Sequence, residues 1–114
     1  MSGTTISGYD TGVIKTSGDL ILTGSADLAG DSYGVYVDDA TVTAITATVD
    51  GGANGTGLYV VDSDDVWVYP MDASGLVGMY VENTPFRWDG GTVDATTAIE
   101  VVESQGTVEN MSWA

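Results

Sequence analysis

The sequence has no cysteine and no histidine among its 114 residues. Disulfide bridges, thiolate metal sites and catalysis by cysteine or histidine are therefore excluded. Basic residues are almost absent too, because Lys15 and Arg87 stand against 17 acidic residues and the formal net charge is −15. Two cations cannot neutralise a phosphate backbone or an anionic lipid surface, so we expect neither nucleic acid nor a membrane as a partner.

Long apolar runs are also missing. No stretch reaches the roughly 18 apolar residues of a membrane span, and residues 1–5 lack the basic and apolar regions of a signal peptide. We therefore expect a cytosolic chain, a mature product or an excised piece of a longer protein. The high negative charge keeps a surface hydrated and is tolerated where salt screens it. It suits a halophilic host or a calcium-rich extracellular setting.

The residues that are plentiful indicate a folded chain of short extended segments. Hydrophobic residues make up 43% of the sequence, which is too much for a disordered acidic tail. Sixteen glycines and only two prolines indicate many turns. The length suffices for one domain, which we expect to span residues 1–114.

A short pattern recurs along the chain. Its copies start with a small residue, followed by an apolar residue, a mostly aromatic one and valine: Gly34–Val37, Gly57–Val60, Gly78–Val81, Ala98–Val101 and, more weakly, Gly12–Lys15. The starts are 22, 23, 21 and 20 residues apart. A second extended triplet follows each start, at 20–22, 42–44, 66–68, 86–88 and, as nearest match in the last copy, 107–109. A third follows in most copies, at 47–49, 71–73, 92–94 and 111–113, and Thr4–Ile6 looks like the end of an earlier copy.

Three short strands in a repeated unit of this length predict a chain that coils, with each coil stacked about 4.8 Å from the one before. The expected fold class is all-β, a parallel solenoid of about five coils. Helices fit poorly, because no apolar period of 3.6 persists. A leucine-rich repeat lacks its leucines and its helical half, whereas a β-sandwich or a small barrel remains an alternative.

The G-Φ-Y-V…D/N-S/T…V-x-V pattern, in which Φ is apolar, resembles the right-handed single-stranded parallel β-helix. This is the fold of pectate lyases, polygalacturonases, phage tailspikes and many surface proteins, and the resemblance covers nearly the whole chain from Thr4 onward. It implies right-handed winding, but the pattern says nothing about chemistry. The family's ladder of stacked asparagines at the turn survives here only at Asn83.

Stacking places equivalent residues in columns, and alternate residues of a strand face opposite sides. The inner first-strand columns are then aliphatic except for Lys15, which predicts a frayed or capping first coil. They read Val13, Val35, Leu58, Met79, Ile99 and Lys15, Val37, Val60, Val81, Val101. The inner second-strand columns read Leu20, Val42, Val66, Phe86 and Leu22, Ala44, Val68, Trp88.

The outer wall is expected to carry a candidate contact surface of Tyr36, Tyr59, Tyr80, Trp67 and Ile21. Two interpretations stay open. Aromatic side chains in neighbouring strands stabilise a sheet by about 0.2–1 kcal/mol per pair. Alternatively, an exposed aromatic surface binds a partner or stacks on sugar rings.

The turn after the first strand forms a column of mostly acidic residues, in which Asp39 lies above Asp62. Like charges one coil apart repel, and a bound calcium ion would relieve that repulsion. A solvated acidic edge is the simpler interpretation. No other cofactor is expected.

Catalysis is not expected. Lys15 lies in an inner column and Arg87 is alone in its copy, so no nucleophile, base and orienting group converge. The histidine motif of polygalacturonases cannot occur, and nothing near Asp64 and Asp65 would raise the pKa of a carboxyl group by burial. We therefore predict that the protein is not an enzyme.

A stacked coil leaves two open ends, which repeat proteins usually cap. No amphipathic helix precedes Gly12, and the chain stops inside an apparent strand. The leading hypothesis is a self-associating structural subunit of an extracellular or cell-surface filament, sheath or layer. The alternative is a glycan-binding module or a fragment of a larger carbohydrate-active or adhesin protein. Asn54 and Asn110 lie in N-glycosylation triplets, which matter only if the protein is exported.

Overall fold

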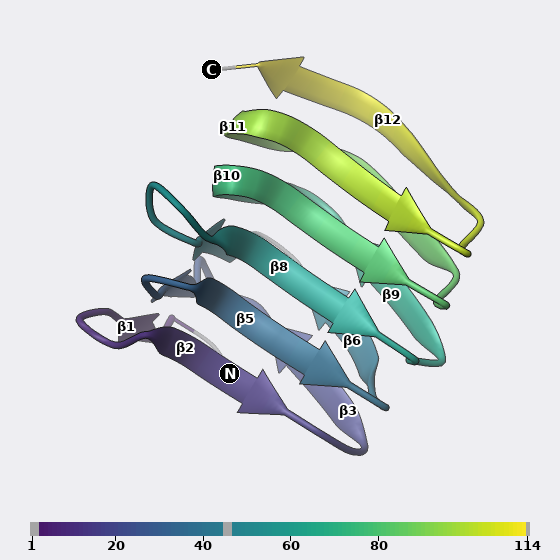
Figure 1. Cartoon of the computed structure of the whole chain (residues 1–114), viewed down its shortest axis with the longest axis horizontal. Helices are drawn as coiled ribbons and strands as arrows, with labels where there is room; N and C mark the ends of the chain where they lie inside the picture. Colours follow the sequence, from purple (N-terminus) through teal and green to yellow (C-terminus); the bar gives the residue numbers. More distant parts are fainter. Residues whose placement is uncertain (1–2, 45–46, 114) are drawn as a thin grey trace.

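A computed structural model describes residues 3–44 and 47–113 of the chain, and in these residues all regular structure is β-strand. Every strand pairs in parallel with its neighbours (Figure 1). The strands are β1 (Thr5–Ile6), β2 (Thr11–Lys15), β3 (Asp19–Leu22), β4 (Asp27–Ala29), β5 (Tyr33–Asp38), β6 (Thr41–Ala44), β7 (Ala47–Asp50), β8 (Thr56–Val61), β9 (Asp65–Val68), β10 (Met71–Glu82), β11 (Phe86–Val102) and β12 (Gly106–Trp113).

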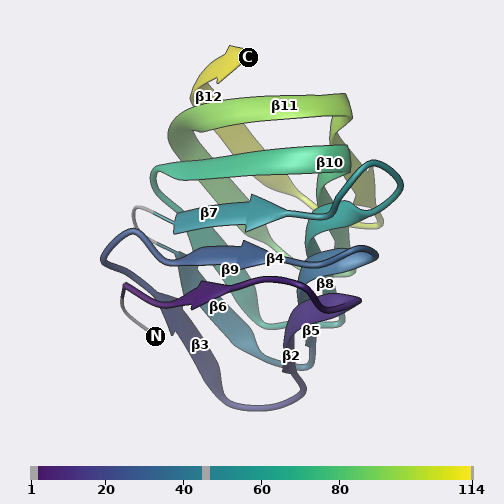
Figure 2. The same cartoon turned by 90° about the vertical axis from the view of Figure 1, so that its left-hand side faces the viewer.

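The strands form three faces around a common interior. The first face holds β2, β5, β8 and residues 77–82 and 97–102. The second face holds β3, β6, β9 and residues 86–88 and 106–108. The third face holds β1, β4, β7 and residues 71–74, 91–94 and 111–113. The chain visits the third, first and second faces in turn and rises in a right-handed sense, as Figures 1 and 2 together show. The predicted right-handed parallel solenoid of about five coils is therefore confirmed.

The long strands β10 and β11 arise because the chain turns corners without leaving the extended conformation. Gly75 lies at the corner of β10 and Gly90 and Gly91 at a corner of β11, all with positive φ. A Cβ on Gly91 would lie 2.0 Å from the carbonyl oxygen of Met71 in the coil below. Glycine is therefore required at this corner for the coils to approach each other.

The first-face columns have the predicted register. Val13, Val35, Leu58, Met79 and Ile99 follow one another across neighbouring strands. The two other faces depart from the prediction at a few positions. In the last coil, Phe86 pairs with Gly106, so residues 106–108 replace the predicted triplet 107–109. On the third face, Val93 pairs with Ala73, which shifts the predicted alignment of 92–94 by one residue.

The third face also contains a strand that the repeat search missed. Asp27–Ala29 forms β4, between β1 and β7. Residues 5–6 of the predicted Thr4–Ile6 segment form β1 and belong to the preceding coil, as predicted.

The interior is the predicted apolar core. The middle coils bury their inner residues completely, including Val35, Leu58, Met79 and Val66, and Trp88 is 1% exposed. Among the described residues, the first and last coils are covered from one side only. Lys15 is therefore half-exposed in the N-terminal coil, and Val101, which was predicted to be interior, is 42% exposed in the last coil.

A column of glycines explains why each copy of the repeat starts with this residue. A Cβ added to Gly34 would lie 2.7 Å from the carbonyl oxygen of Gly57, and the same contact recurs from Gly57 to Gly78 at 2.8 Å. These distances are too short for a real Cβ. The strands can therefore stack at this corner only when the side chain is absent.

A ladder of hydroxyl groups joins the coils at the turn between the first and second faces. The Oγ of Ser63 accepts a hydrogen bond from the backbone N–H of Ala40 at 3.2 Å and donates one to the carbonyl oxygen of Val61 at 2.9 Å. Thr84 Oγ1 likewise accepts from Ser63 N at 3.0 Å, and Ser104 Oγ accepts from Thr84 N at 2.9 Å. These side chains satisfy backbone donors that the turn would otherwise bury unpaired. Hydroxyl groups thus occupy the inner side of this turn, one position after the column in which the resemblance implied asparagines.

Candidate functional site

The three tyrosines of the predicted contact surface form a stack on the first face. The ring centroids of Tyr36 and Tyr59 are 5.1 Å apart with an interplanar angle of 10°. Those of Tyr59 and Tyr80 are 4.6 Å apart with an angle of 7°. Tyr33, which the repeat search missed, packs against Tyr36 at 5.2 Å and Tyr59 at 5.0 Å. We call Tyr33, Tyr36, Tyr59 and Tyr80 the tyrosine ladder.

The position of Tyr33 departs from simple strand alternation. It pairs with Thr56 and Thr11 in the column just before the glycine column. Alternation would place residues 33 and 36 on opposite sides, but the ring contacts of Tyr33 with Tyr36 and Tyr59 show that it lies on the outer wall. The sequence signal for this position is weak, because the other residues of this column are not aromatic.

The upper end of the tyrosine ladder is held by a hydrogen bond. The hydroxyl of Tyr80 donates to Oε1 of Glu82 at 2.7 Å. This bond, followed by desolvation and the negative charge of Glu82, raises the pKa of Tyr80 to about 12. Burial, followed by the neighbouring Tyr33 and Tyr36, also raises the pKa of Tyr59. Tyr59 and Tyr80 therefore stay neutral at physiological pH.

Trp67 and Ile21 lie apart from the tyrosine ladder. Both belong to the second face, which follows the first face after the turn, and Thr43 separates them within one outer column. Trp67 is 44% exposed and Ile21 is 52% exposed. The structure thus divides the predicted contact surface between two faces.

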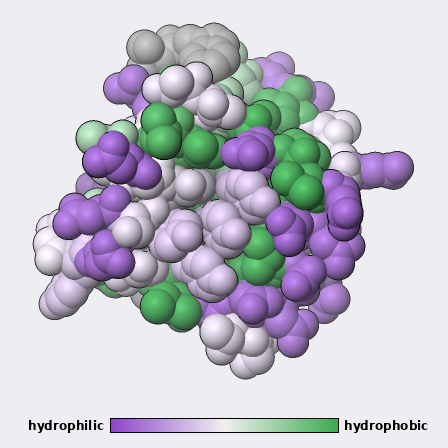
Figure 3. Space-filling view, in the orientation of Figure 1, coloured by the Kyte–Doolittle hydropathy of each residue, from purple (hydrophilic) through white to green (hydrophobic). Residues whose placement is uncertain are grey.

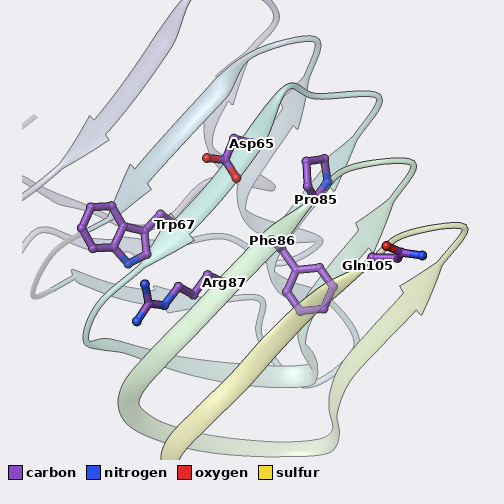
Figure 4. Close-up of a pocket in the computed structure, with 6 residues that line it drawn as sticks. All are labelled: Asp65, Trp67, Pro85, Phe86, Arg87 and Gln105. Atoms are coloured by element: carbon purple, nitrogen blue, oxygen red, sulfur yellow. The ribbon is translucent and has the colours of Figure 1, made fainter.

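A shallow pocket of about 320 Å³ lies beside Trp67 on the second face. It is lined by Asp65, Trp67, Pro85, Phe86, Arg87 and Gln105 (Figure 4). Asp65, Pro85 and Gln105 come from one outer column at the beginning of successive second-face strands, and Trp67 and Arg87 from the next outer column. Register alone therefore brings an acidic, an amide, a basic and two aromatic side chains together.

Gly106 lies against Phe86, which lines the pocket. A Cβ on Gly106 would lie 2.5 Å from Cδ1 of Phe86. Any larger residue at position 106 would therefore collide with the ring that lines the pocket. The predicted triplet 107–109 leaves this glycine outside the repeat, so its contact with Phe86 was not predicted.

Arg87 is partly neutralised by two carboxylates. Its Nη2 lies 3.4 Å from Oε1 of Glu109 and 3.6 Å from Oδ2 of Asp89. Glu109 shares a column with Asp89, whereas Thr107 pairs with Arg87. The sequence pattern predicts an outer second-strand column in which Glu109 follows Arg87. This is wrong by two residues, because Thr107 takes that position, although the side chains of Arg87 and Glu109 still meet.

The acidic turn column lies at the end of the first-face strands. Asp39, Asp62, Asn83 and Glu103 all adopt positive φ, between 48° and 60°. Asn and Asp tolerate this conformation better than most residues. Asn83 Nδ2 donates to Oδ1 of Asp62 at 3.1 Å. Figure 3 shows the hydrophilic side chains gathered along this edge of the molecule.

Asp39 and Asp62 occupy the same turn position in successive coils, as predicted. Within residues 3–44 and 47–113, no group of three or more acidic side chains is arranged to hold a metal ion. Calcium binding at Asp39 and Asp62 stays a prediction. The Asn83 amide already engages one oxygen of Asp62, so an ion there would share or displace that hydrogen bond.

The fold defines the chain as a parallel β-solenoid. Comparison with known protein families, curated proteins and solved structures gives no match. The described part of the chain also has no helix long and apolar enough to cross a membrane.

Proposed function

We propose that this chain is a non-enzymatic structural protein that associates end to end, as a subunit of an extracellular filament, sheath or surface layer. The proposal includes a relationship to the pectate-lyase-like surface proteins that the repeat resembles. The observation that carries it is that the described coils leave both ends of the solenoid uncovered. Each end presents parallel strand edges of the same geometry, and such edges are templates for pairing with another chain.

The C-terminal end offers residues 97–102 and 106–113, with Val101 42% and Val108 43% exposed. The N-terminal end offers β2 and β3 on the first and second faces. The best occupant for either end is a second copy of this chain, because the interior columns of the two ends then continue into each other. Such a head-to-tail contact is heterologous and can extend into a fibre.

The column pattern fixes the register of this joint on the first face. Thr11 of a second copy would lie over Thr97, and Gly12 of that copy over Ala98. A Cβ on Gly78 lies 2.6 Å from the oxygen of Ala98 one coil above. The real Cβ of Ala98 would meet the oxygen of the incoming Gly12 at a similar distance. The joint must therefore be looser than a contact between coils of one chain.

The third face imposes a second condition on the joint. Described segments fill six levels on this face, from β1 to residues 111–113, but five levels on each of the other faces. If the first and second faces of two copies join without a gap, β1 of one copy and residues 111–113 of the other would have to occupy the same position in the stack of the third face. β1 pairs through only two residues, so it is the segment that yields.

Charge makes the association dependent on salt. Each copy carries a net charge of −15, so two copies repel until counter-ions screen them. We expect monomers at low ionic strength and concentration-dependent assemblies in molar sodium chloride.

Sedimentation velocity and electron microscopy across a salt series test the proposal. Wild type should assemble at high salt, and Ala98→Gly should assemble at lower protein concentration because the obstructing Cβ is gone. Ala95→Gly, which alters a neighbouring alanine of the same strand, is the matched control and should behave as wild type. Monomers of both wild type and Ala98→Gly at every salt concentration, with no filaments in micrographs, would contradict end-to-end assembly.

A further inference from the structure

Ring packing separates the exposed aromatics into two kinds. In the tyrosine ladder, the rings of Tyr36, Tyr59 and Tyr80 lie face to face at 4.6–5.1 Å. Neighbouring rings therefore cover the faces of Tyr59, and a planar ligand meets mainly ring edges there. Trp67 makes no ring contact with another aromatic residue in the described part of the chain, and 44% of it is exposed. Trp67 is thus the aromatic side chain in the predicted set that can accept a stacked ligand.

Polar groups without partners surround Trp67 in its pocket. Within the described residues, no hydrogen bond involves the Trp67 indole N–H, the Asp65 carboxylate or the Gln105 side-chain amide. The first is a donor, the second an acceptor, and the third is both. Figure 4 shows them on different sides of the same depression. A ligand with several hydroxyl groups can pair with all three.

Charge narrows the class of ligand. An anion would approach a chain of net charge −15 and would meet Asp65 directly. Arg87 does not offset the repulsion between an anionic ligand and Asp65, because Glu109 and Asp89 already lie 3.4 Å and 3.6 Å from the Nη2 of Arg87. A neutral ligand with several hydroxyl groups avoids this penalty and can still pair with the unpartnered polar groups.

We infer that the Trp67 pocket binds a neutral saccharide, with one sugar ring stacked on the Trp67 indole. The hydroxyl groups of the ring would pair with Asp65, Gln105 and the free donors of Arg87. The volume of about 320 Å³ lies at the small end of ligand sites, which suits one or two sugar rings. The open shape exposes much of the ligand, so binding is weak and gains from repetition along a polymer.

This inference stands apart from end-to-end assembly. The pocket opens on a side face, so a monomer can bind the ligand. Saccharide binding can therefore be measured at low salt, where monomers are expected. The result of that measurement does not depend on whether the protein forms filaments.

NMR titration of the ¹⁵N-labelled protein with cellobiose, lactose and maltose tests the inference, with digalacturonic acid as the anionic comparator. At least one neutral disaccharide should shift the Trp67 indole N–H and the Gln105 side-chain amide signals with millimolar affinity. The anionic comparator should bind at least about tenfold more weakly, which is the effect of one adverse charge contact.

Variants assign the binding to the pocket. Trp67→Ala should weaken binding by about tenfold or more, and Gln105→Ala should weaken it severalfold. Tyr9→Ala removes an aromatic side chain that is 65% exposed and lies outside the pocket, and it is the matched control. No shift with any of the neutral disaccharides, or equal binding by wild type and Trp67→Ala, overturns the inference. Stronger binding of digalacturonic acid than of every neutral disaccharide also overturns it.

Discussion

Gly78 lies so close to Ala98 that a Cβ on the glycine would be 2.6 Å from the alanine carbonyl oxygen. The same relationship links Gly12 to Gly34, Gly34 to Gly57 and Gly57 to Gly78 at 2.6–2.8 Å. One corner of the solenoid therefore excludes side chains wherever another coil lies above. Ala98 carries a side chain in the last described coil of this column, and no described strand lies above it.

Gly57→Ala should lower the free energy of unfolding by about 2–3 kcal/mol, because the added methyl group forces neighbouring backbones apart. Ala98→Gly is the control in the same column and should cost only about 0.5–1 kcal/mol. Urea denaturation followed by circular dichroism measures both changes. Equal effects of the two substitutions would show that the glycine column does not limit coil spacing.

Thr84→Val should cost about 1–3 kcal/mol, although the two side chains have nearly the same shape. The hydroxyl of Thr84 donates to Glu82 O and accepts from Ser63 N at 3.0 Å each, and its loss leaves buried polar groups unpaired. Thr107→Val is the matched control, because Thr107 is exposed on the second face and should change stability by less than about 0.5 kcal/mol. The hydroxyl ladder would be unimportant if both variants unfolded at the wild-type urea concentration.

Stability should fall as the pH rises from 10 to about 12. The fold raises the pKa of Tyr80 from 10.0 to about 12, so it favours the protonated phenol. This contribution is fully present below pH 10.0 and is lost as the pH rises through the folded-state value. Phenolate absorbance and the urea midpoint, measured together, report the titration and the loss of stability.

Tyr80→Phe should show a shallower alkaline decline than wild type, because it has no phenol to ionise at this position. Tyr9→Phe is the control, since Tyr9 is 65% exposed and lies outside the tyrosine ladder. If Tyr80→Phe and wild type declined in parallel, the hydrogen bond to Glu82 would have no part in alkaline unfolding.

Calcium and magnesium chloride should raise the melting temperature equally when compared at the same ionic strength. Both ions screen the net charge of −15, and the described residues contain no group of three carboxylates arranged for one ion. Differential scanning calorimetry makes the comparison. A rise specific to calcium that disappears in Asp62→Asn would instead establish the site predicted at Asp39 and Asp62.

The repeat predicted the first face well because its signal is physical and regular. Glycine is required at the corner, apolar residues are required inside, and both recur at nearly constant spacing from Gly34 to Val81. The prediction of the second face was wrong in the last coil, because Gly106 occupies an inner position although it has no apolar side chain. Asp27–Ala29 was missed for a similar reason, because a three-residue strand with one large apolar residue, Leu28, resembles a loop.

The candidate site was only partly predictable. Stacking of Tyr36, Tyr59 and Tyr80 follows from their common column. The separation of Trp67 from these tyrosines depends on the angle of the turn after the first face, which residue spacing does not encode. The pocket beside Trp67 also depends on how the last coil pairs with the coil before it, and the predicted triplet 107–109 was one residue away from the observed pairing at Gly106.

Coil stacking itself is tested most directly by the distance between two residues of one column. Ile14 and Glu100 lie in the same outer column, four strand spacings apart, which corresponds to about 19 Å at about 4.8 Å per coil. The chain has no cysteine, so spin labels on Ile14→Cys and Glu100→Cys report this pair alone by pulsed electron paramagnetic resonance. A narrow distribution near that separation, broadened only by the label arms, is the predicted result. A broad distribution, or one centred well beyond 30 Å (more than about six strand spacings), would contradict the stacked parallel coils.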